Sequence, residues 1–128
     1  MSDEVNDPLI AIVDHDEAIR AAVDSLLRSA GYRSVVFASG IAFLDSRDKH
    51  EIGCLVLDMD MPRLNGLEVQ RRLAEMDYLI PPTIFLTGNM GKLCEKALKQ
   101  GAVAVLRKTC SHEDLLNAIS SALHPRRT

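Results

Sequence analysis

The chain has 128 residues, enough for one domain with a sizeable core, and 47% of them are hydrophobic and 26% charged. The net charge of −3 gives no electrostatic case for binding nucleic acid or an anionic membrane, and no apolar run approaches the roughly 20 residues that span a bilayer. The polar stretch at residues 1–8 is not a signal peptide, and the three widely spaced cysteines argue against a disulfide scaffold, so we expect a cytoplasmic protein.

The first predicted elements are a strand, a helix, a second strand and a short helix. Residues 9–13 are continuously apolar and mostly β-branched, which is typical of a strand covered on both faces. Asp16 is the predicted N-cap of the following helix, and Gly31 ends that helix as a left-handed C-cap. The second strand is predicted at residues 35–37, and Ser39 caps the short helix after it.

A third strand is predicted at residues 54–58, where four apolar residues run directly into the carboxylate of Asp58. Asp60 follows two positions later, and Pro62 then prevents further ladder pairing. A helix is predicted from residue 64 to residue 76. Its inward-facing residues are predicted to be Leu67, Leu73 and Met76.

The last part of the chain adds two strands and two helices. The strands are predicted at residues 84–86 and 103–106. Gly101 ends the fourth helix, Ser111 caps the fifth, and Pro125 stops the fifth before a basic tail. The inward stripe of the fourth helix is predicted to be Met90, Leu93, Ala97 and Leu98.

Five short strands that alternate with five helices predict a parallel α/β sheet with right-handed crossovers. We expect a single domain over residues 1–128, with its core at residues 8–124 and short polar N-terminal and basic C-terminal tails. No second domain is expected in this sequence.

Polar side chains follow four of the five predicted strands: Asp14, Asp58 with Asp60, Thr87 and Lys108. The carboxyl ends of parallel strands lie on one edge of a sheet, where ligands bind, so we expect these groups to converge. Carboxylates, a hydroxyl and a lysine suit phosphoryl transfer, which needs mainly positioning and charge neutralisation. Asp58 is the expected nucleophile, because it ends the most central strand and can form an acyl phosphate.

At these residues the chain resembles the receiver domain of a two-component response regulator, over residues 8–124. It is most similar to receivers attached to LuxR-type DNA-binding domains. The resemblance implies a flavodoxin-like, doubly wound (βα)5 three-layer sandwich with sheet order 2-1-3-4-5. The motifs that carry it are Val13-Asp14-x-Asp16-Glu17-Ala18-Ile19-Arg20, Phe37-Ala38-Ser39-Gly40, Leu57-Asp58-Met59-Asp60-Met61-Pro62, Leu86-Thr87-Gly88, Gly101-Ala102 and Lys108.

The resemblance also implies the chemistry of each strand end. Asp58 would accept a phosphoryl group from a histidine kinase or phosphotransfer protein, and Thr87 and Lys108 would contact that group. Asp60 and Asn89 would be neighbours that tune the reaction rates. The domain would act as a signalling switch and not as an enzyme. Its fourth helix, fifth strand and fifth helix would form the surface for an output protein, a DNA-binding domain or a second copy of the chain.

The implied cofactor is Mg²⁺, and its ligands are where the chain departs from the family. Asp58, the backbone carbonyl of Asp60 and, through water, Asp14 would hold the ion. The second acid after the first strand, normally a direct ligand, is here His15, and imidazole is a poor ligand for Mg²⁺. We therefore expect weakened or altered metal binding, partly compensated by the side chain of Asp60. A second hypothesis places protonated His15 where the cation would sit, and a third makes it a loop residue without a role.

Two further departures concern the fifth strand. Thr109 replaces the proline after the family's lysine, so the usual basis for a cis peptide bond at that point is lost. Val105 stands where receivers often have an aromatic residue, so an aromatic rotamer switch cannot operate there.

Two other functions compete with the phosphoacceptor. A receiver-fold interaction module that works without phosphorylation is favoured by His15, Val105 and Thr109. A haloacid-dehalogenase-like phosphatase is a remote alternative, because Asp58-x-Asp60 resembles its nucleophile motif. That motif belongs near the first strand of such enzymes, whereas here it follows the third.

Overall fold

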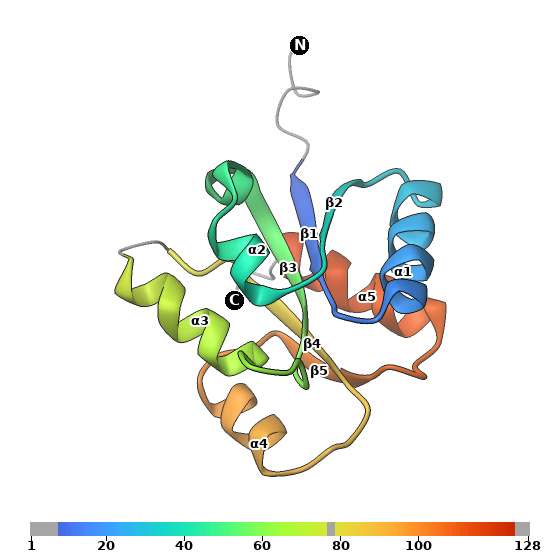
Figure 1. Cartoon of the computed structure of the whole chain (residues 1–128). Helices are drawn as coiled ribbons and strands as arrows, with labels where there is room; N and C mark the ends of the chain where they lie inside the picture. The colour runs from blue at the N-terminus through green and yellow to red at the C-terminus, as the bar shows by residue number, and fades with distance from the viewer. Residues whose placement is uncertain (1–7, 77–78, 125–128) are drawn as a thin grey trace.

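A computed structural model of the chain describes residues 8–76 and 79–124 (Figure 1). The predicted tails at residues 1–7 and 125–128, including Pro125 as a helix stop, lie outside the described residues.

Five parallel strands form one sheet in the order β2-β1-β3-β4-β5, which confirms the predicted flavodoxin-like topology. The central strand β3 is the longest and pairs with β1 on one side and β4 on the other. Because all strands run the same way, their carboxyl ends share one edge. The strands are β1 (Leu9–Val13), β2 (Arg33–Phe37), β3 (Ile52–Asp58), β4 (Thr83–Thr87) and β5 (Ala104–Arg107).

The helices cover both faces of the sheet, with α1 and α5 on one side and α2, α3 and α4 on the other (Figure 1). A 3₁₀-helix that the sequence did not predict, Arg47–Glu51, leads into β3. None of the described helices has the length and apolarity that a bilayer crossing requires. The α-helices are α1 (Glu17–Ser29), α2 (Gly40–Leu44), α3 (Gly66–Glu75), α4 (Lys92–Lys99) and α5 (His112–Leu123).

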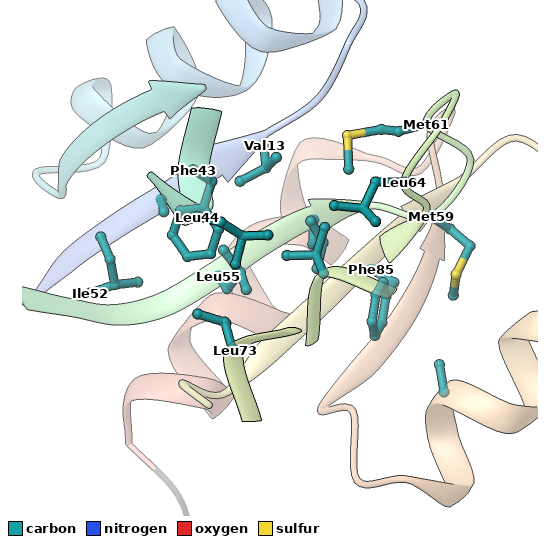
Figure 2. Close-up of a cluster of buried hydrophobic side chains, with 14 of the residues drawn as sticks. Val13, Phe43, Leu44, Ile52, Leu55, Met59, Met61, Leu64, Leu73 and Phe85 are labelled. Carbon is teal, nitrogen blue, oxygen red and sulfur yellow. The ribbon is translucent and has the colours of Figure 1, made fainter. Parts of the chain in front are cut away.

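Two hydrophobic clusters, one on each face of the sheet, hold the layers together. Alternate residues of β3 point to opposite faces: Leu55 and Leu57 pack under α2 and α3, while Cys54 and Val56 pack under α1 and α5. The first cluster includes Phe85 and the methionines that follow β3 (Figure 2). Burial on both faces fixes the register of β3 and therefore the position of Asp58 at its end.

The predicted helix caps are confirmed. The side chain of Asp16 accepts hydrogen bonds from the backbone N–H groups of Ala18 and Ile19 at the start of α1. Ser39 and Ser111 cap α2 and α5 in the same way. Gly31, just after α1, has φ = +92°, the left-handed conformation predicted for it.

The predicted inward face of α4 is wrong in three of its four residues. Ala97 is buried, but Met90, Leu93 and Leu98 are exposed, and Cys94 takes the inward position instead. The small side chains of Cys94 and Ala97 therefore form the buried face of this short helix, and its leucines lie on the solvent side. Met76, predicted to face inward at the end of the third helix, is also exposed.

Candidate functional site

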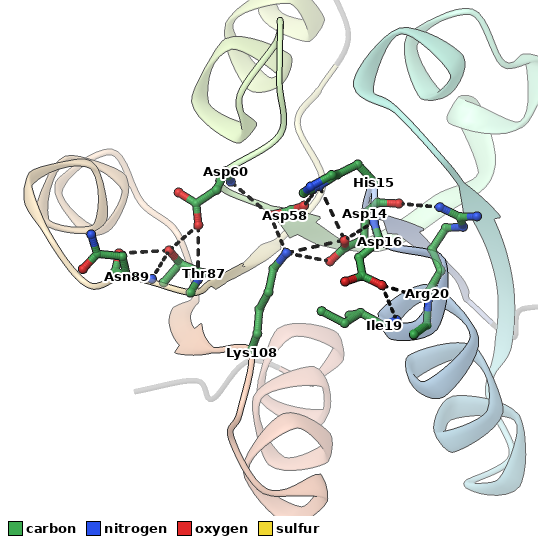
Figure 3. A network of polar contacts seen from close by, with 12 residues as sticks. Asp14, His15, Asp16, Ile19, Arg20, Asp58, Asp60, Thr87, Asn89 and Lys108 are labelled. Atoms are coloured by element: carbon green, nitrogen blue, oxygen red, sulfur yellow. Dashed lines mark hydrogen bonds and ion pairs between the residues drawn. The ribbon is translucent and has the colours of Figure 1, made fainter.

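Asp14, Asp58 and Lys108 meet at the carboxyl edge of the sheet, as the topology predicted, and Thr87 lies at the same edge, where its hydroxyl contacts Asp60 (Figure 3). Their side chains come from the ends of four neighbouring strands or from the residues just after them. Asp14 and Asp58 are buried, and Lys108 reaches both carboxylates from the far end of β5. Residues up to 94 positions apart in the sequence therefore form one polar site.

Asp58 is fully buried, yet three donors surround its carboxylate. Its Oδ1 atom accepts a hydrogen bond of 3.0 Å from the backbone N–H of Asp60 and lies 3.1 Å from Lys108 Nζ. Its Oδ2 atom lies 2.7 Å from His15 Nδ1. Burial by itself raises the pKa of this carboxyl, but the Asp60 N–H, His15 and Lys108 together hold the pKa of Asp58 below its ordinary value. The Asp58 carboxylate is thus ionised at neutral pH.

The contact of His15 with Asp58 bears on the three hypotheses for this histidine. An ionised carboxylate only accepts hydrogen bonds, so Nδ1 must carry the proton in the 2.7 Å contact with Asp58. The same nitrogen lies 3.8 Å from Asp14 Oδ1. The imidazole therefore lies in the site, directly beside the carboxylate of Asp58.

Asp14 has the least complete set of partners. Its Oδ1 atom accepts the backbone N–H of Asp16 at 2.8 Å, but its buried Oδ2 atom has no hydrogen-bond donor, and its closest cation is Lys108 Nζ at 3.4 Å. Burial raises the pKa of the Asp14 carboxyl, and the neighbouring Asp58 charge adds to this rise.

Lys108 lies between the two acids and is largely buried. Burial lowers the pKa of this ammonium, but Asp58 and Asp14 outweigh it and hold the pKa of Lys108 above its ordinary value. The peptide bonds of the described residues are all trans, including the Lys108–Thr109 bond. The neighbouring strand residue Val105 is buried against the α4 side of the sheet.

Asp60 does not turn toward the other acids. Its Oδ2 atom accepts a hydrogen bond of 2.7 Å from the Thr87 hydroxyl and one of 3.2 Å from the Gly88 N–H. Thr87 Oγ1 in turn accepts the Asn89 backbone N–H at 3.1 Å. We expected the side chain of Asp60 to compensate for His15 at the metal position. In the structure this carboxylate is instead hydrogen-bonded to Thr87 and Gly88 at the end of β4.

Two residues of the site were missed in the sequence. Arg20 donates a hydrogen bond of 2.9 Å to the backbone carbonyl of Asp14, and its place one turn after the Asp16 cap was the available signal. Gly66 lies so close to β3 and β4 that an added Cβ atom would stand 2.9 Å from the Asp58 carbonyl oxygen and 2.7 Å from the ring of Phe85. The Asn65-Gly66 pair, a typical turn signal, pointed to it.

The arrangement offers an ionised, buried carboxylate, a lysine charge beside it and a hydroxyl on the next strand. These groups suit the transfer of a phosphoryl group, whose oxygens need neutralisation and hydrogen-bond donors. The unpartnered Oδ2 of Asp14 and the carboxylate of Asp58 fit a divalent cation, but the imidazole of His15 does not fit the all-oxygen environment that Mg²⁺ prefers.

The family described as the response regulator receiver domain matches residues 10–120. The chain belongs to this family. The response regulator protein TmoT of Ectopseudomonas mendocina is 45% identical over 116 residues, which are 90% of this chain and 52% of TmoT. TodT of Pseudomonas putida is 41% identical over 124 residues, covering 96% of this chain and 53% of TodT. Among solved structures, the response regulator StyR superposes with a TM-score of 0.82 and 36% identity, over 91% of this chain and 59% of StyR.

These relatives are named as response regulators. The transcriptional regulatory protein FixJ is also similar, which confirms the predicted resemblance to receivers of LuxR-type regulators. The chain spans about half the length of TmoT and TodT. Receiver domains of response regulators are signalling domains that work with histidine kinases and output domains, and they typically bind Mg²⁺ at an acidic pocket.

Proposed function

We propose that this domain accepts a phosphoryl group on Asp58 from the phosphohistidine of a histidine kinase or phosphotransfer protein. A carboxylate oxygen of Asp58 would attack phosphorus, the phosphorus–nitrogen bond would break, and the donor imidazole would leave with the electron pair. The observation that carries this proposal is the buried Asp58 carboxylate, whose pKa is held low by donors at 2.7–3.1 Å.

The neighbours have separate roles in this proposal. Lys108, 3.1 Å from Asp58, neutralises a phosphoryl oxygen, and the Thr87 hydroxyl donates to another oxygen after leaving Asp60. Asp60 and Asn89 tune the rates because they hold that hydroxyl in its present position. A divalent cation bound beside Asp58 would supply further positive charge. We propose that Mg²⁺ binds there more weakly than in a His15→Asp variant.

The response would appear on α4, β5 and α5. This proposal is supported by the side chains of Leu93 and Leu98, which α4 exposes to solvent. An output protein, a DNA-binding domain or a second copy of the chain would bind this surface in the cytoplasm. Residues 1–128 would act as one receiver domain in that process.

Incubation with acetyl phosphate and a divalent cation, followed by mass spectrometry of the intact protein, tests the proposal. We expect one added phosphoryl group on the wild-type chain and none on Asp58→Asn. Asp45→Asn is the matched control, since Asp45 is an exposed carboxylate after α2, and this variant should be labelled normally. Label on Asp58→Asn would assign the phosphoacceptor to another residue.

A second candidate is a receiver that signals without phosphorylation. The observation that favours it is His15, which already occupies one oxygen of Asp58 at 2.7 Å. Absence of label from the wild type, with normal folding, would support this candidate. The phosphatase alternative gains no such support, because Asp58 lies on β3, third along the chain.

A further inference from the structure

Asp14, His15 and Asp58 each direct one donor atom into the same small space. These two oxygens and one nitrogen all lie within 4.8 Å of one another. Neighbouring ligands of an ion with bonds of about 2.1 Å are about 3 Å apart in octahedral geometry. The His15 Nδ1 distances of 2.7 Å to Asp58 and 3.8 Å to Asp14 bracket that value, so a small widening accommodates an ion.

Asp14 supplies an independent sign that a ligand is missing. The residue is 1% exposed, and its Oδ2 atom has no hydrogen-bond donor. A buried polar atom without a partner costs free energy unless a ligand or water satisfies it. Lys108 Nζ lies 3.4 Å from this atom without a hydrogen bond to it; its hydrogen bond to Asp14, of 3.5 Å, goes to Oδ1, and the same ammonium also contacts Asp58. Two buried carboxylates therefore face a single lysine charge, which leaves a place for further positive charge.

We propose that Asp14, His15 and Asp58 form a site for a divalent first-row transition ion, of the Mn²⁺ to Zn²⁺ series, in preference to Mg²⁺. The ion replaces the proton of His15 Nδ1 and lies between that nitrogen and the two carboxylates. The inference deepens the proposed phosphoacceptor function, since it names the cation beside Asp58, but its test needs no phosphoryl transfer.

The donor set decides between the ions. Mg²⁺ takes oxygen ligands and releases water reluctantly, so it gains little from an imidazole. Imidazole suits transition ions, and affinity at such mixed sites rises from Mn²⁺ through Co²⁺ to Cu²⁺. An all-oxygen site also follows this order, so the decisive quantity is how far selectivity depends on His15.

Cobalt titration of the untagged, metal-free chain tests the inference. Co²⁺ affinity is measured from its visible absorption bands, and Mg²⁺ affinity by competition. We expect His15→Gln to weaken Co²⁺ binding by at least about tenfold, since loss of even an outer-shell partner costs 10–100-fold. His15→Asp should strengthen Mg²⁺ binding and lower the preference for Co²⁺. His112→Gln is the matched control, because His112 starts α5 and is no part of the cluster.

Proton NMR of the Co²⁺-loaded wild type gives a readout that does not depend on the variants folding. A strongly shifted, exchangeable imidazole N–H signal is expected from a cobalt-bound ring. Absence of that signal, equal Co²⁺ affinity in wild type and a folded His15→Gln, or no Co²⁺ binding by the wild type would each overturn the inference. Asp58 labelling by acetyl phosphate is measured separately, so failure of the phosphoacceptor proposal is distinguishable from failure of this one.

Discussion

Asp14 and Asp58 lie side by side, yet the pKa values of their carboxyl groups are shifted in opposite directions. Both are buried, and burial raises the pKa of each. The difference lies in the donors, because Asp58 receives the Asp60 N–H, His15 and a close Lys108, while one oxygen of Asp14 has no donor. The ionised form of Asp58 is thus stabilised, whereas the negative charge of Asp14 is only partly compensated.

The poorly compensated negative charge of Asp14 predicts that Asp14→Asn stabilises the metal-free protein at pH 7. A raised pKa in the folded state means that the ionised carboxyl opposes folding above that pKa. We expect a gain of about 0.5–2 kcal/mol, the range of single stabilising substitutions. The gain should shrink as the pH falls through the raised pKa and vanish below the ordinary value of 3.8, where both states are protonated. Urea unfolding with a chelator, at several pH values, measures it.

Asp58→Asn serves as the control for this prediction. The pKa of Asp58 is lowered, so its charge favours folding above 3.8 and this contribution is lost only at lower pH. Asp58→Asn should therefore destabilise the protein at pH 7. Equal effects of the two substitutions would contradict the electrostatic account of the site.

The Asp60–Thr87 contact predicts an energetic coupling between β3 and β4. The hydroxyl proton of Thr87 has two acceptors, and the charged carboxylate at 2.7 Å is preferred to the Asn89 carbonyl at 3.0 Å. A double-mutant cycle of Asp60→Ala and Thr87→Val should give a coupling of about 1.5–3 kcal/mol. Asp60→Ala combined with Ser111→Ala, a cap on α5, should be additive. A coupling near zero in the first cycle would show that the contact does not stabilise the resting site.

At the level of elements, the start of α3 fixes the loop that follows Asp58. Asn65 and Glu68 form a reciprocal capping box, with hydrogen bonds of 2.8 and 2.9 Å. Gly66, the first residue of α3, then packs against the Asp58 carbonyl oxygen and the ring of Phe85. The loop that follows Asp58 is therefore packed against a position of α3 that has no room for a side chain.

Gly66→Ala is expected to destabilise the protein by about 1–3 kcal/mol, the cost of overpacking. The added Cβ would stand 2.7 Å from Phe85 and 2.9 Å from a backbone oxygen that cannot rotate away. Gly91→Ala is the control, because a Cβ there meets nothing within 4 Å and its φ of −159° suits any residue. Chemical denaturation compares the two, and equal stabilities would contradict the close packing of α3 on the site.

Sequence patterns placed some elements well and others poorly. The whole of β1 and the carboxyl end of β3 were predicted correctly, because a continuous apolar run that ends in a polar residue is typical of a buried strand in a parallel sheet; β3 starts two residues earlier than predicted, at Ile52. For α4, periodicity could not distinguish a face of Leu93, Ala97 and Leu98 from one of Cys94 and Ala97. The choice depends on how closely the helix approaches the sheet. Likewise, the convergence of Asp58 and Lys108 followed from the sheet topology, but the hydrogen bond that the Thr87 hydroxyl donates to Asp60 depends on side-chain geometry.

Across the whole molecule, the site lies closer to one edge strand of the sheet in its contacts than to the other. β2 forms one edge and β5 the other, with the site between them at the ends of β1, β3 and β4. The β5 edge is linked to the site directly, since Lys108 follows β5 and contacts both Asp14 and Asp58. A phosphoryl group that draws Lys108 and Thr87 toward it would shift the β5 and α4 side first, because those residues belong to that side.

Two exposed apolar residues, one on α4 and one on the edge strand β2, allow a test of which surface responds to activation. Leu98 on α4 and Val36 on β2 are 51% and 43% exposed. If activation creates a dimer through α4, β5 and α5, sedimentation velocity with beryllofluoride and a divalent cation should show a dimer for wild type and Val36→Ser. Leu98→Ser should remain a monomer under the same conditions. Both serine variants should keep nearly wild-type stability, because exposed side chains usually change it by less than about 0.5 kcal/mol. A dimer lost in Val36→Ser but kept in Leu98→Ser would place the interface at the β2 edge and reject the proposed output surface.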